Sequence, residues 1–270
     1  MSRKYTSFEL EKNGHIAELF LNRPNKRNAM GLEFWQELTE IMSELDQDQS
    51  IRVVIIAGRG KMFSSGLDLT SMPNIPGFDF SGQSPEGRIN LVSYVKMWQD
   101  ALSAIENCRK PVIAAIHGGC VGGGLDLISA SDIRLASKDA YFSLREAAMA
   151  MIADLGSLQR LPLIIGQGLT RELAFTARDV GAEEALKMGL INHFYEDQET
   201  LIKEAHLMAK QIANNAPLAI QSTKDVLNYS RDKTVNAGLH YALVRNSMIL
   251  PSGELLEAFQ AFMEKRKPNF

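Results

Sequence analysis

The stretch Pro111-Val-Ile-Ala-Ala-Ile-His-Gly-Gly-Cys-Val-Gly-Gly-Gly124-Leu-Asp-Leu127 decides how this chain folds. Its first half, 111–116, is a short run of β-branched and small residues, which is typical of a strand buried on both faces. Its second half holds five glycines in the seven positions 118–124, and residues 124–130 are then apolar at helical spacing. The glycines are therefore predicted to lie at or near the N-terminus of a helix.

A helix N-terminus presents unpaired N–H groups at the positive end of the helix dipole, and this favours an anion. The stretch fits neither Gly-x-Gly-x-x-Gly nor a P-loop, because no Lys-Ser or Lys-Thr follows Gly124. An oxyanion formed during a reaction fits better, with one of these amides acting alongside a second N–H from elsewhere. A glycine-rich turn that serves only close strand–helix packing is the alternative.

Composition excludes several classes of function. The chain has 270 residues, 45% of them hydrophobic, which suits one large or two small domains. A formal net charge of −3 and the lack of long Lys/Arg runs argue against nucleic-acid binding. No apolar segment follows the first residues, so we expect no signal peptide, no membrane span and a cytoplasmic location. Two cysteines and no His-x-x-x-His pair give a disulfide framework or a metal site little support.

Periodicity predicts an α/β core, 1–200, followed by a helical region, 201–270. The hairpin signal Asn13-Gly14 lies between two predicted antiparallel strands within 8–21. Further predicted strands are 51–57, 111–116, 132–136, 140–143 and 191–194. Predicted helices are 31–45, 88–108, 169–177, 182–188, 199–214, 216–228, 234–250 and 254–265.

Two loops precede the glycine stretch. Residues 58–69 form a polar, glycine-bearing loop directly after a predicted strand, where open α/β sheets place their ligands. This loop is a candidate for the second oxyanion donor. Residues 72–87 are rich in Pro, Gly and Ser, and they are either a flap beside the substrate or a surface insertion without function.

Three acids lie near the glycine stretch: Asp126, Glu146 and Asp154. Asp154 follows seven uncharged residues, 147–153, and an apolar setting would raise its pKa toward that of a usable base. Alternatively, Asp154 is the N-cap of a helix that starts near residue 155.

Several motifs together resemble the crotonase (enoyl-CoA hydratase/isomerase) superfamily over nearly the whole chain. They are Asn22-Arg23-Pro24 with Arg27-Asn28-Ala29-Met30, Phe63-Ser64-Ser65-Gly66-Leu67-Asp68, 111–126, Leu158-Gln159-Arg160-Leu161-Pro162, Ala182-x-x-Ala185-x-x-x-Gly189-Leu190 and Phe262-Met-Glu-Lys-Arg-Lys. The resemblance implies an α/β spiral of ββα units with a helical C-terminal trimerisation region. It also implies a homotrimer or homohexamer that acts on an acyl-CoA thioester without a metal or redox cofactor.

The same resemblance assigns roles to residues. It implies an oxyanion hole made by the amides of Leu67 and Gly123, which agrees with one donor from each glycine-bearing stretch. The implied substrate-binding residues are Ser65, Gly66, Leu67, Asp68, Leu69 and Gly123. In hydratases of this family, glutamates stand at the positions of Asp126 and Glu146, and the position of Asp154 is usually glycine.

The three-acid set looks like that of isomerases that convert 3,5-dienoyl-CoA to 2,4-dienoyl-CoA in fatty acid β-oxidation. In such isomerases the acid at Asp154 takes a proton from C2, and the acid at Glu146 delivers one to C6. Asp126 is either an acceptor that holds Glu146 protonated or an inert acid. The alternative activity is an enoyl-CoA hydratase, which adds water to a 2-enoyl-CoA.

The spacing of two of these acids predicts a bend in the chain. Eight residues of unbroken helix would part Glu146 from Asp154 by about 12 Å, too far for both to act on one diene. The chain must therefore turn back between them, although 147–153 contains neither glycine nor proline.

Overall fold

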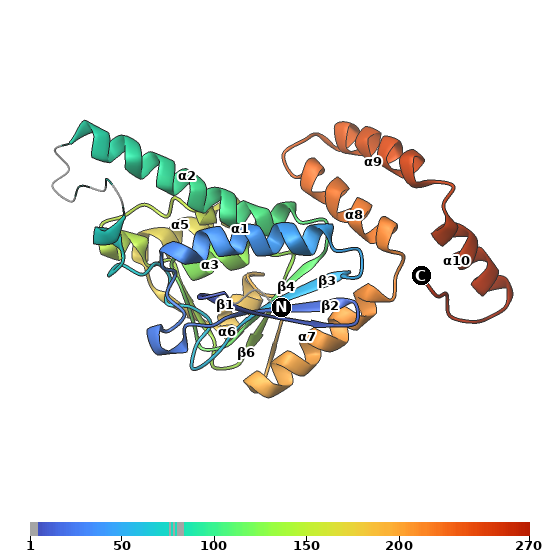
Figure 1. Cartoon of the computed structure of the whole chain (residues 1–270), viewed down its shortest axis with the longest axis horizontal. Coiled ribbons are helices and arrows are strands. Elements are labelled where there is room, and N and C mark those ends of the chain that lie inside the picture. The colour runs from blue at the N-terminus through green and yellow to red at the C-terminus, as the bar shows by residue number, and fades with distance from the viewer. Residues whose placement is uncertain (1–4, 76, 78, 80–83) are drawn as a thin grey trace.

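The computed structural model describes residues 5–75, 77, 79 and 84–270. Helices cover both faces of a central sheet, and the last three helices form an arm beside it (Figure 1). The strands are β1 (Phe8–Asn13), β2 (Ile16–Leu21), β3 (Val53–Gly58), β4 (Val112–Ile116), β5 (Gly119–Val121), β6 (Ile133–Ser137), β7 (Tyr141–Ser143), β8 (Asp179–Gly181) and β9 (His193–Tyr195). The helices are α1 (Leu32–Gln47), α2 (Pro85–Asn107), α3 (Gly123–Ser129), α4 (Ser157–Ile164), α5 (Gly166–Thr176), α6 (Ala182–Lys187), α7 (Gln198–Ala213), α8 (Pro217–Ser230), α9 (Val235–Ile249) and α10 (Gly253–Met263).

Within the described residues, the larger sheet has the strand order β1-β2-β3-β4-β6-β9. β1 and β2 are antiparallel, as the Asn13-Gly14 signal predicts, and the later neighbours are parallel. β3 is buried along its whole length. Because side chains alternate along a strand, Val54 and Ile56 pack on the side of α1, and Val53 and Ile55 pack on the side of α7.

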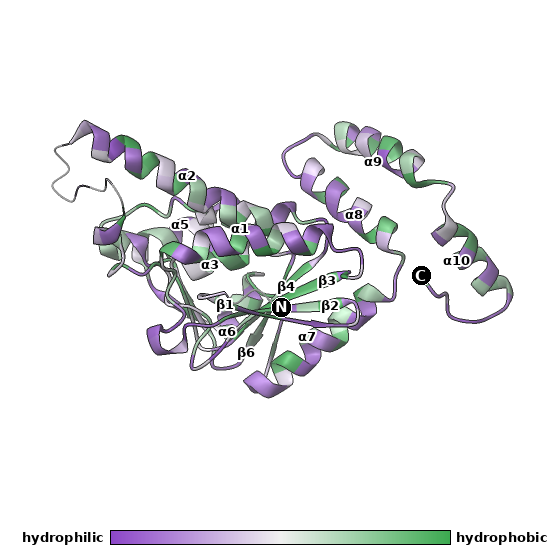
Figure 2. Ribbon diagram, in the orientation of Figure 1, coloured by the Kyte–Doolittle hydropathy of each residue, from purple (hydrophilic) through white to green (hydrophobic). Residues whose placement is uncertain are grey.

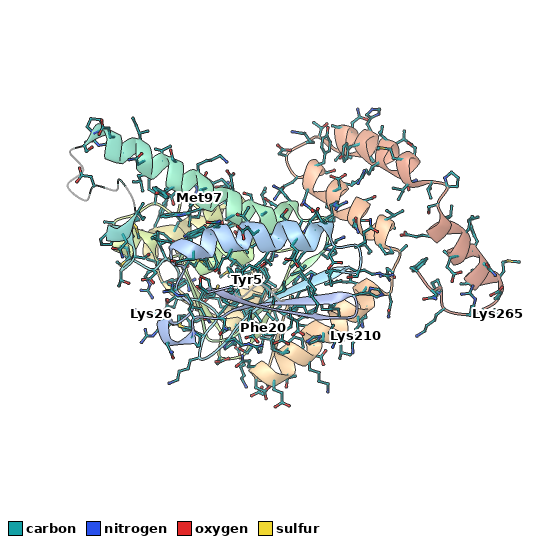
Figure 3. All side chains as sticks on the ribbon, in the orientation of Figure 1. Tyr5, Phe20, Lys26, Met97, Lys210 and Lys265 are labelled. Carbon is teal, nitrogen blue, oxygen red and sulfur yellow. The ribbon has the colours of Figure 1, made fainter. Side chains whose placement is uncertain are left out.

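The two covering layers differ in their side chains. Above the sheet, α1 and α2 meet through the stacked rings of Trp35 and Trp98, whose centroids are 5.2 Å apart. Below it, α7 presents Ala205 and Ala209, small residues that allow close approach to the strands. Figure 2 shows apolar colour concentrated in the sheet and polar colour on the outer helix faces. In Figure 3 the arm around Lys265 is set apart from the part that holds Tyr5 and Phe20.

Successive parts of the chain repeat one ββα pattern. After β3, Ser64 forms an isolated parallel bridge with Cys120 of β5. β5 follows β4 and pairs in turn with β7, Cys120 opposite Phe142, and β7 follows β6. Each turn thus places one strand in the large sheet and a second short strand or bridge in the next layer, and a helix follows. This arrangement confirms the expected spiral of ββα units.

The structure differs from the sequence prediction in the glycine stretch. Residues 118–124 do not form one turn, because β5 lies between a first turn at Gly118 and a second at Gly122. β8 was not predicted either. Both are three-residue strands that owe their extended form to neighbouring strands rather than to a pattern of their own.

Two predicted boundaries differ from those of the structure. The division between 200 and 201 falls inside α7, which packs on the sheet, so the arm itself consists of α8–α10. Of the loop predicted at 72–87, residues 76, 78 and 80–83 lie outside the described residues. α2 begins at Pro85, three residues before the predicted start, because the hydroxyl of Ser84 accepts the Gly87 N–H and caps the helix.

Candidate active site

Two backbone amides face the same small space. Gly66 has φ +84°, and a β-carbon on it would lie 2.7 Å from the carbonyl oxygen of Val121 and 3.2 Å from the Gly123 nitrogen. The loop before α2 can therefore approach the start of α3 this closely only with glycine at position 66. In the described part of the chain, neither the Leu67 nor the Gly123 N–H donates a hydrogen bond. Two adjacent donors are thus available to one acceptor atom.

Polar side chains hold the Leu67 loop in place. The hydroxyl of Ser64 donates to the carbonyl of Asn28 at 3.0 Å and accepts the Gly66 N–H at 3.1 Å. The carboxylate of Asp68 is ion-paired with Arg23, with Nη2 and Oδ2 3.0 Å apart. Of the residues expected to bind substrate, Asp68 is the exception, because its side chain turns to Arg23 and does not line the cavity.

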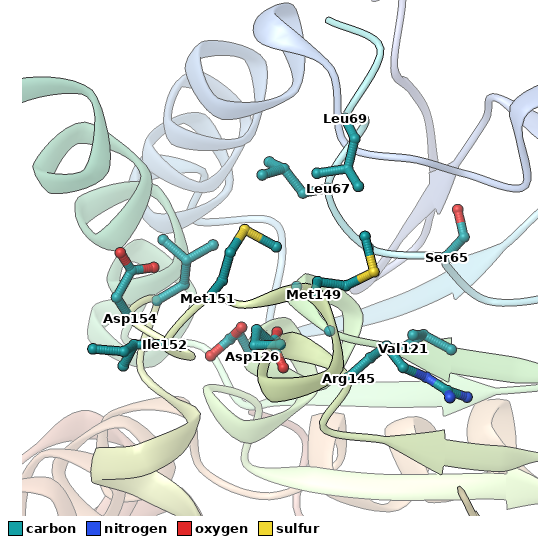
Figure 4. Close-up of a pocket in the computed structure, with 15 residues that line it drawn as sticks. Ser65, Leu67, Leu69, Val121, Asp126, Arg145, Met149, Met151, Ile152 and Asp154 are labelled. Atoms are coloured by element: carbon teal, nitrogen blue, oxygen red, sulfur yellow. The ribbon is translucent and has the colours of Figure 1, made fainter. Parts of the chain in front are cut away.

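A cavity of about 190 Å³ opens in front of these amides. The expected residues that line it are Ser65, Gly66, Leu67, Leu69, Gly123, Asp126, Glu146 and Asp154. Those that we did not predict are Val121, Gly122, Arg145, Met149, Met151, Ile152 and Leu155. Figure 4 shows Met149 and Met151 between Arg145 and Asp154, with Ile152 beside Asp154. The only sequence signal for these three residues is the uncharged run between the two acids.

The three acids reach this cavity from different elements. Asp126 belongs to α3, Glu146 begins the 3₁₀ turn Glu146–Met149, and Asp154 lies in the loop before α4. Ala150 ends the 3₁₀ turn in the left-handed region, with φ +57°. The predicted bend between Glu146 and Asp154 is confirmed, and an alanine makes it in a conformation that usually favours glycine.

The helix-capping interpretation of Asp154 is wrong. The N-cap position of α4 is Gly156, which has no side chain with which to cap the helix. Asp154 instead contributes its backbone carbonyl, which accepts the Gln99 amide at 2.6 Å, and its carboxyl group lines the cavity. This frees the carboxyl group for chemistry.

Burial raises the pKa of all three acids, and neighbouring negative charge adds to this effect at Asp126 and Glu146. Burial, reinforced by the charges of Asp126 and Asp154, raises the pKa of Glu146 to about 7. Burial raises the pKa of Asp126 to about 6, against the effect of hydrogen bonds from Ser157. Burial also raises the pKa of Asp154, although this residue stays exposed to solvent. Near neutral pH, Glu146 can therefore hold a proton to donate, and the solvent-exposed Asp154 offers a second carboxyl group to the same cavity.

The model of the enoyl-CoA hydratase/isomerase family matches residues 11–270. The chain belongs to the enoyl-CoA hydratase/isomerase family. A similar solved structure, an enoyl-CoA hydratase from Bacillus anthracis, has a TM-score of 0.89 and 30% identity, covering 98% of this chain and 99% of that one.

Two curated relatives distinguish between the activities of this family. A Dictyostelium discoideum protein is 42% identical over 99% of this chain and 91% of its own length. An Arabidopsis thaliana protein is 45% identical over 94% of this chain and 92% of its own length. Both are named Delta(3,5)-Delta(2,4)-dienoyl-CoA isomerase, the first mitochondrial and the second peroxisomal. The similarity favours an isomerase over a hydratase.

Proposed function

We propose that this protein isomerises 3,5-dienoyl-CoA to 2,4-dienoyl-CoA in fatty acid β-oxidation. The observation that carries the proposal is the third acid, since Asp154 shares one cavity with Glu146 and with the two unpaired amides. A hydratase of this family usually has glycine at the position of Asp154. The names of the relatives support the same activity.

The reaction would begin at the thioester carbonyl. Its oxygen accepts hydrogen bonds from the Leu67 and Gly123 amides, and ionised Asp154 removes a proton from C2. The electron pair of the C2–H bond moves into the conjugated system and gives a dienolate, whose negative charge lies partly on the carbonyl oxygen. Each fixed amide can stabilise that charge by roughly 3 kcal/mol, because both donors are already oriented.

Protonation at the far carbon would complete the reaction. Glu146 gives its proton to C6, the double bonds then lie at C2 and C4, and the negative charge returns from the substrate to the enzyme. The turnover leaves Asp154 protonated and Glu146 ionised, and proton exchange with solvent resets both. Asp126 acts through its charge, because no hydrogen bond joins its carboxyl group to that of Glu146 among the described residues.

An ultraviolet assay tests the activity. Purified protein is given a 3,5-dienoyl-CoA and, separately, a 2-enoyl-CoA. We expect the absorbance of a conjugated 2,4-dienoyl thioester to appear with the first substrate, and hydration of the second to be slow in comparison. Efficient hydration of the 2-enoyl-CoA without isomerisation of the dienoyl-CoA would contradict the proposal.

The assembly would be a homotrimer or homohexamer formed through the arm. Support comes from large apolar side chains that stand exposed on α8–α10: Leu227, Val235, Leu239, Leu243, Met248, Leu256, Phe259 and Phe262. An isolated chain would rarely expose so many. Light scattering after size-exclusion chromatography measures the mass, and a monomer would contradict the assembly.

Two expectations stay predictions. One is that the reaction needs no metal or redox cofactor, since coenzyme A is part of the substrate. The other is a cytoplasmic location, whereas the relatives' names place those proteins in mitochondria or peroxisomes. Among the helices of the described residues, none combines the length and apolarity that a membrane span requires.

A further inference from the structure

Asp126 is held by a residue that the sequence did not single out. The backbone N–H of Ser157 donates to Asp126 Oδ1 at 2.6 Å, and the Ser157 hydroxyl donates to the same oxygen. Ser157 is the first residue of α4 and has no exposed surface, and Asp126 is 1% exposed. Both hydrogen bonds are therefore shielded from water. They stabilise the ionised carboxylate more than the neutral acid.

Glu146 has fewer donors, since among the described residues only its own backbone N–H acts on its carboxyl group. Its Oε2 is buried and, among the described residues, has no hydrogen-bond partner. An ionised carboxylate in that position would be costly, whereas a protonated one costs less. The negative charge of Asp126 adds to this preference. The two carboxyl groups thus have unequal surroundings. Those of Asp126 stabilise a negative charge better than those of Glu146.

We propose that Ser157 is a positioning residue, which keeps Asp126 ionised and so fixes the proton of the Asp126–Glu146 pair on Glu146. The inference rests on the proposed role of Glu146 as the acid that protonates C6. Ser157 would keep Glu146 protonated before substrate binds, without contacting the substrate itself.

Other titratable and charged groups face the pair. Asp154, from the loop before α4, raises the pKa of both carboxyl groups. Arg160, on α4, opposes this at Asp126, and Cys120, on β5, is a buried neutral thiol. None of these groups donates a hydrogen bond to Asp126 among the described residues, so Ser157 remains the specific contact.

A spectroscopic titration tests the proposal without any turnover. Infrared difference spectra across pH report protonated carboxyl groups, and the band that disappears in Glu146→Gln identifies Glu146. In Ser157→Ala, loss of one charge-assisted hydrogen bond should raise the pKa of Asp126 by about one to two pH units. The proton then moves to Asp126, so the Glu146 band should lose at least about half its intensity near pH 7 and return below about pH 6.

Matched variants separate this effect from general damage to the fold. Ser157→Thr keeps the hydroxyl and should restore the wild-type titration. Ser129→Ala removes another buried hydroxyl of the same region, one that donates to the Asp126 backbone carbonyl at 2.7 Å rather than to its carboxylate. It should leave the Glu146 band unchanged. An unchanged band in folded Ser157→Ala, or an equal loss in Ser129→Ala, would overturn the proposal.

Kinetics give a second readout. With a 3,5-dienoyl-CoA, Ser157→Ala should lower kcat by about 3- to 10-fold near pH 7, and the deficit should shrink as both carboxyl groups become protonated below about pH 6. A deficit that is the same at every pH would assign Ser157 a structural role only. If the wild-type protein fails to isomerise the dienoyl-CoA, the proposed function fails, while the infrared titration still decides where the proton lies.

Discussion

Replacing Gly123 with valine would place a side chain where the two unpaired amides meet. A β-carbon on Gly123 would lie 3.0 Å from Met30 Sδ, 3.7 Å from the Leu67 nitrogen and 3.8 Å from Gly66 Cα. The two methyl groups of valine extend beyond that point, into a space already close to contact. The backbone of Gly123 is helical rather than left-handed, so the damage comes from lost space and not from strain.

The size of the effect follows from the donors that the carbonyl oxygen would lose. Removing one oxyanion donor costs about 3 to 4 kcal/mol, so kcat should fall by about 10²- to 10³-fold. KM should change much less, because the oxygen carries most of its charge in the transition state. The assay is formation of the conjugated 2,4-dienoyl thioester, with circular dichroism and Tm as checks of folding.

The control must be a glycine with room for a side chain. Gly168→Ala fits, because nothing lies within 4 Å of a β-carbon there. Gly118→Ala does not fit, because its β-carbon would lie 2.6 Å from the carbonyl oxygen of Lys61 at φ +55°. A folded Gly123→Val protein with kcat within about threefold of wild type would refute the reasoning. The glycine stretch would then serve packing alone.

Three further outcomes are expected. Asp154→Asn and Glu146→Gln should each lower kcat by about 10²-fold or more while thioester binding, measured by calorimetry, stays nearly intact; near wild-type kcat would contradict the assigned role. The pKa of Glu146 is raised to about 7 in the folded protein, so its stability contribution is lost as pH rises from about 4.5 to 7. Glu146→Gln should therefore raise the free energy of unfolding by up to about 3 kcal/mol at pH 8 and leave it unchanged at pH 4. Equal gains at both pH values would exclude titration of Glu146 as the cause. Lys224→Met removes the ammonium that lies 2.6 Å from the Asp132 carboxylate and leaves that carboxylate without its ion-pair partner. Urea unfolding should show a loss of about 2 kcal/mol that the exposed control Lys233→Met lacks.

Much of the fold could be predicted because its signals are local. The apolar run at 111–116, the Asn13-Gly14 turn and the helical periodicity of 31–45 each point to one structure within a short window, and the structure has β4, the β1–β2 hairpin and α1 there. The unpredicted strands β5 and β8 carry too few residues for a pattern, and they depend on partners that are distant in sequence.

The sequence predicts individual residues of the candidate site but not the contacts that bring them together. The sequence indicates a bend between Glu146 and Asp154 but not which residue makes it, because nothing about an alanine predicts the left-handed conformation of Ala150. Ser157 carries no sequence signal either, since its contact with Asp126 joins two segments 31 residues apart. Long-range contacts of this kind appear only when the turns of the spiral are stacked.

The stacked turns divide the site into main-chain donors, which a substitution can obstruct but not remove, and side-chain acids, which a substitution removes outright. Leu67 and Gly123 lie three residues beyond Ser64 and Cys120, which are bridged partners in neighbouring turns, and Arg145 lies three beyond Phe142 in the next. The first two turns supply main-chain amides, which no exchange of side chain deletes. The third turn leads directly to Glu146, which acts through its side chain, and a substitution can remove that side chain. In the proposed mechanism, carbonyl activation therefore depends on the fold and proton placement depends on side chains that can diverge, which suits a family whose name spans both hydration and isomerisation.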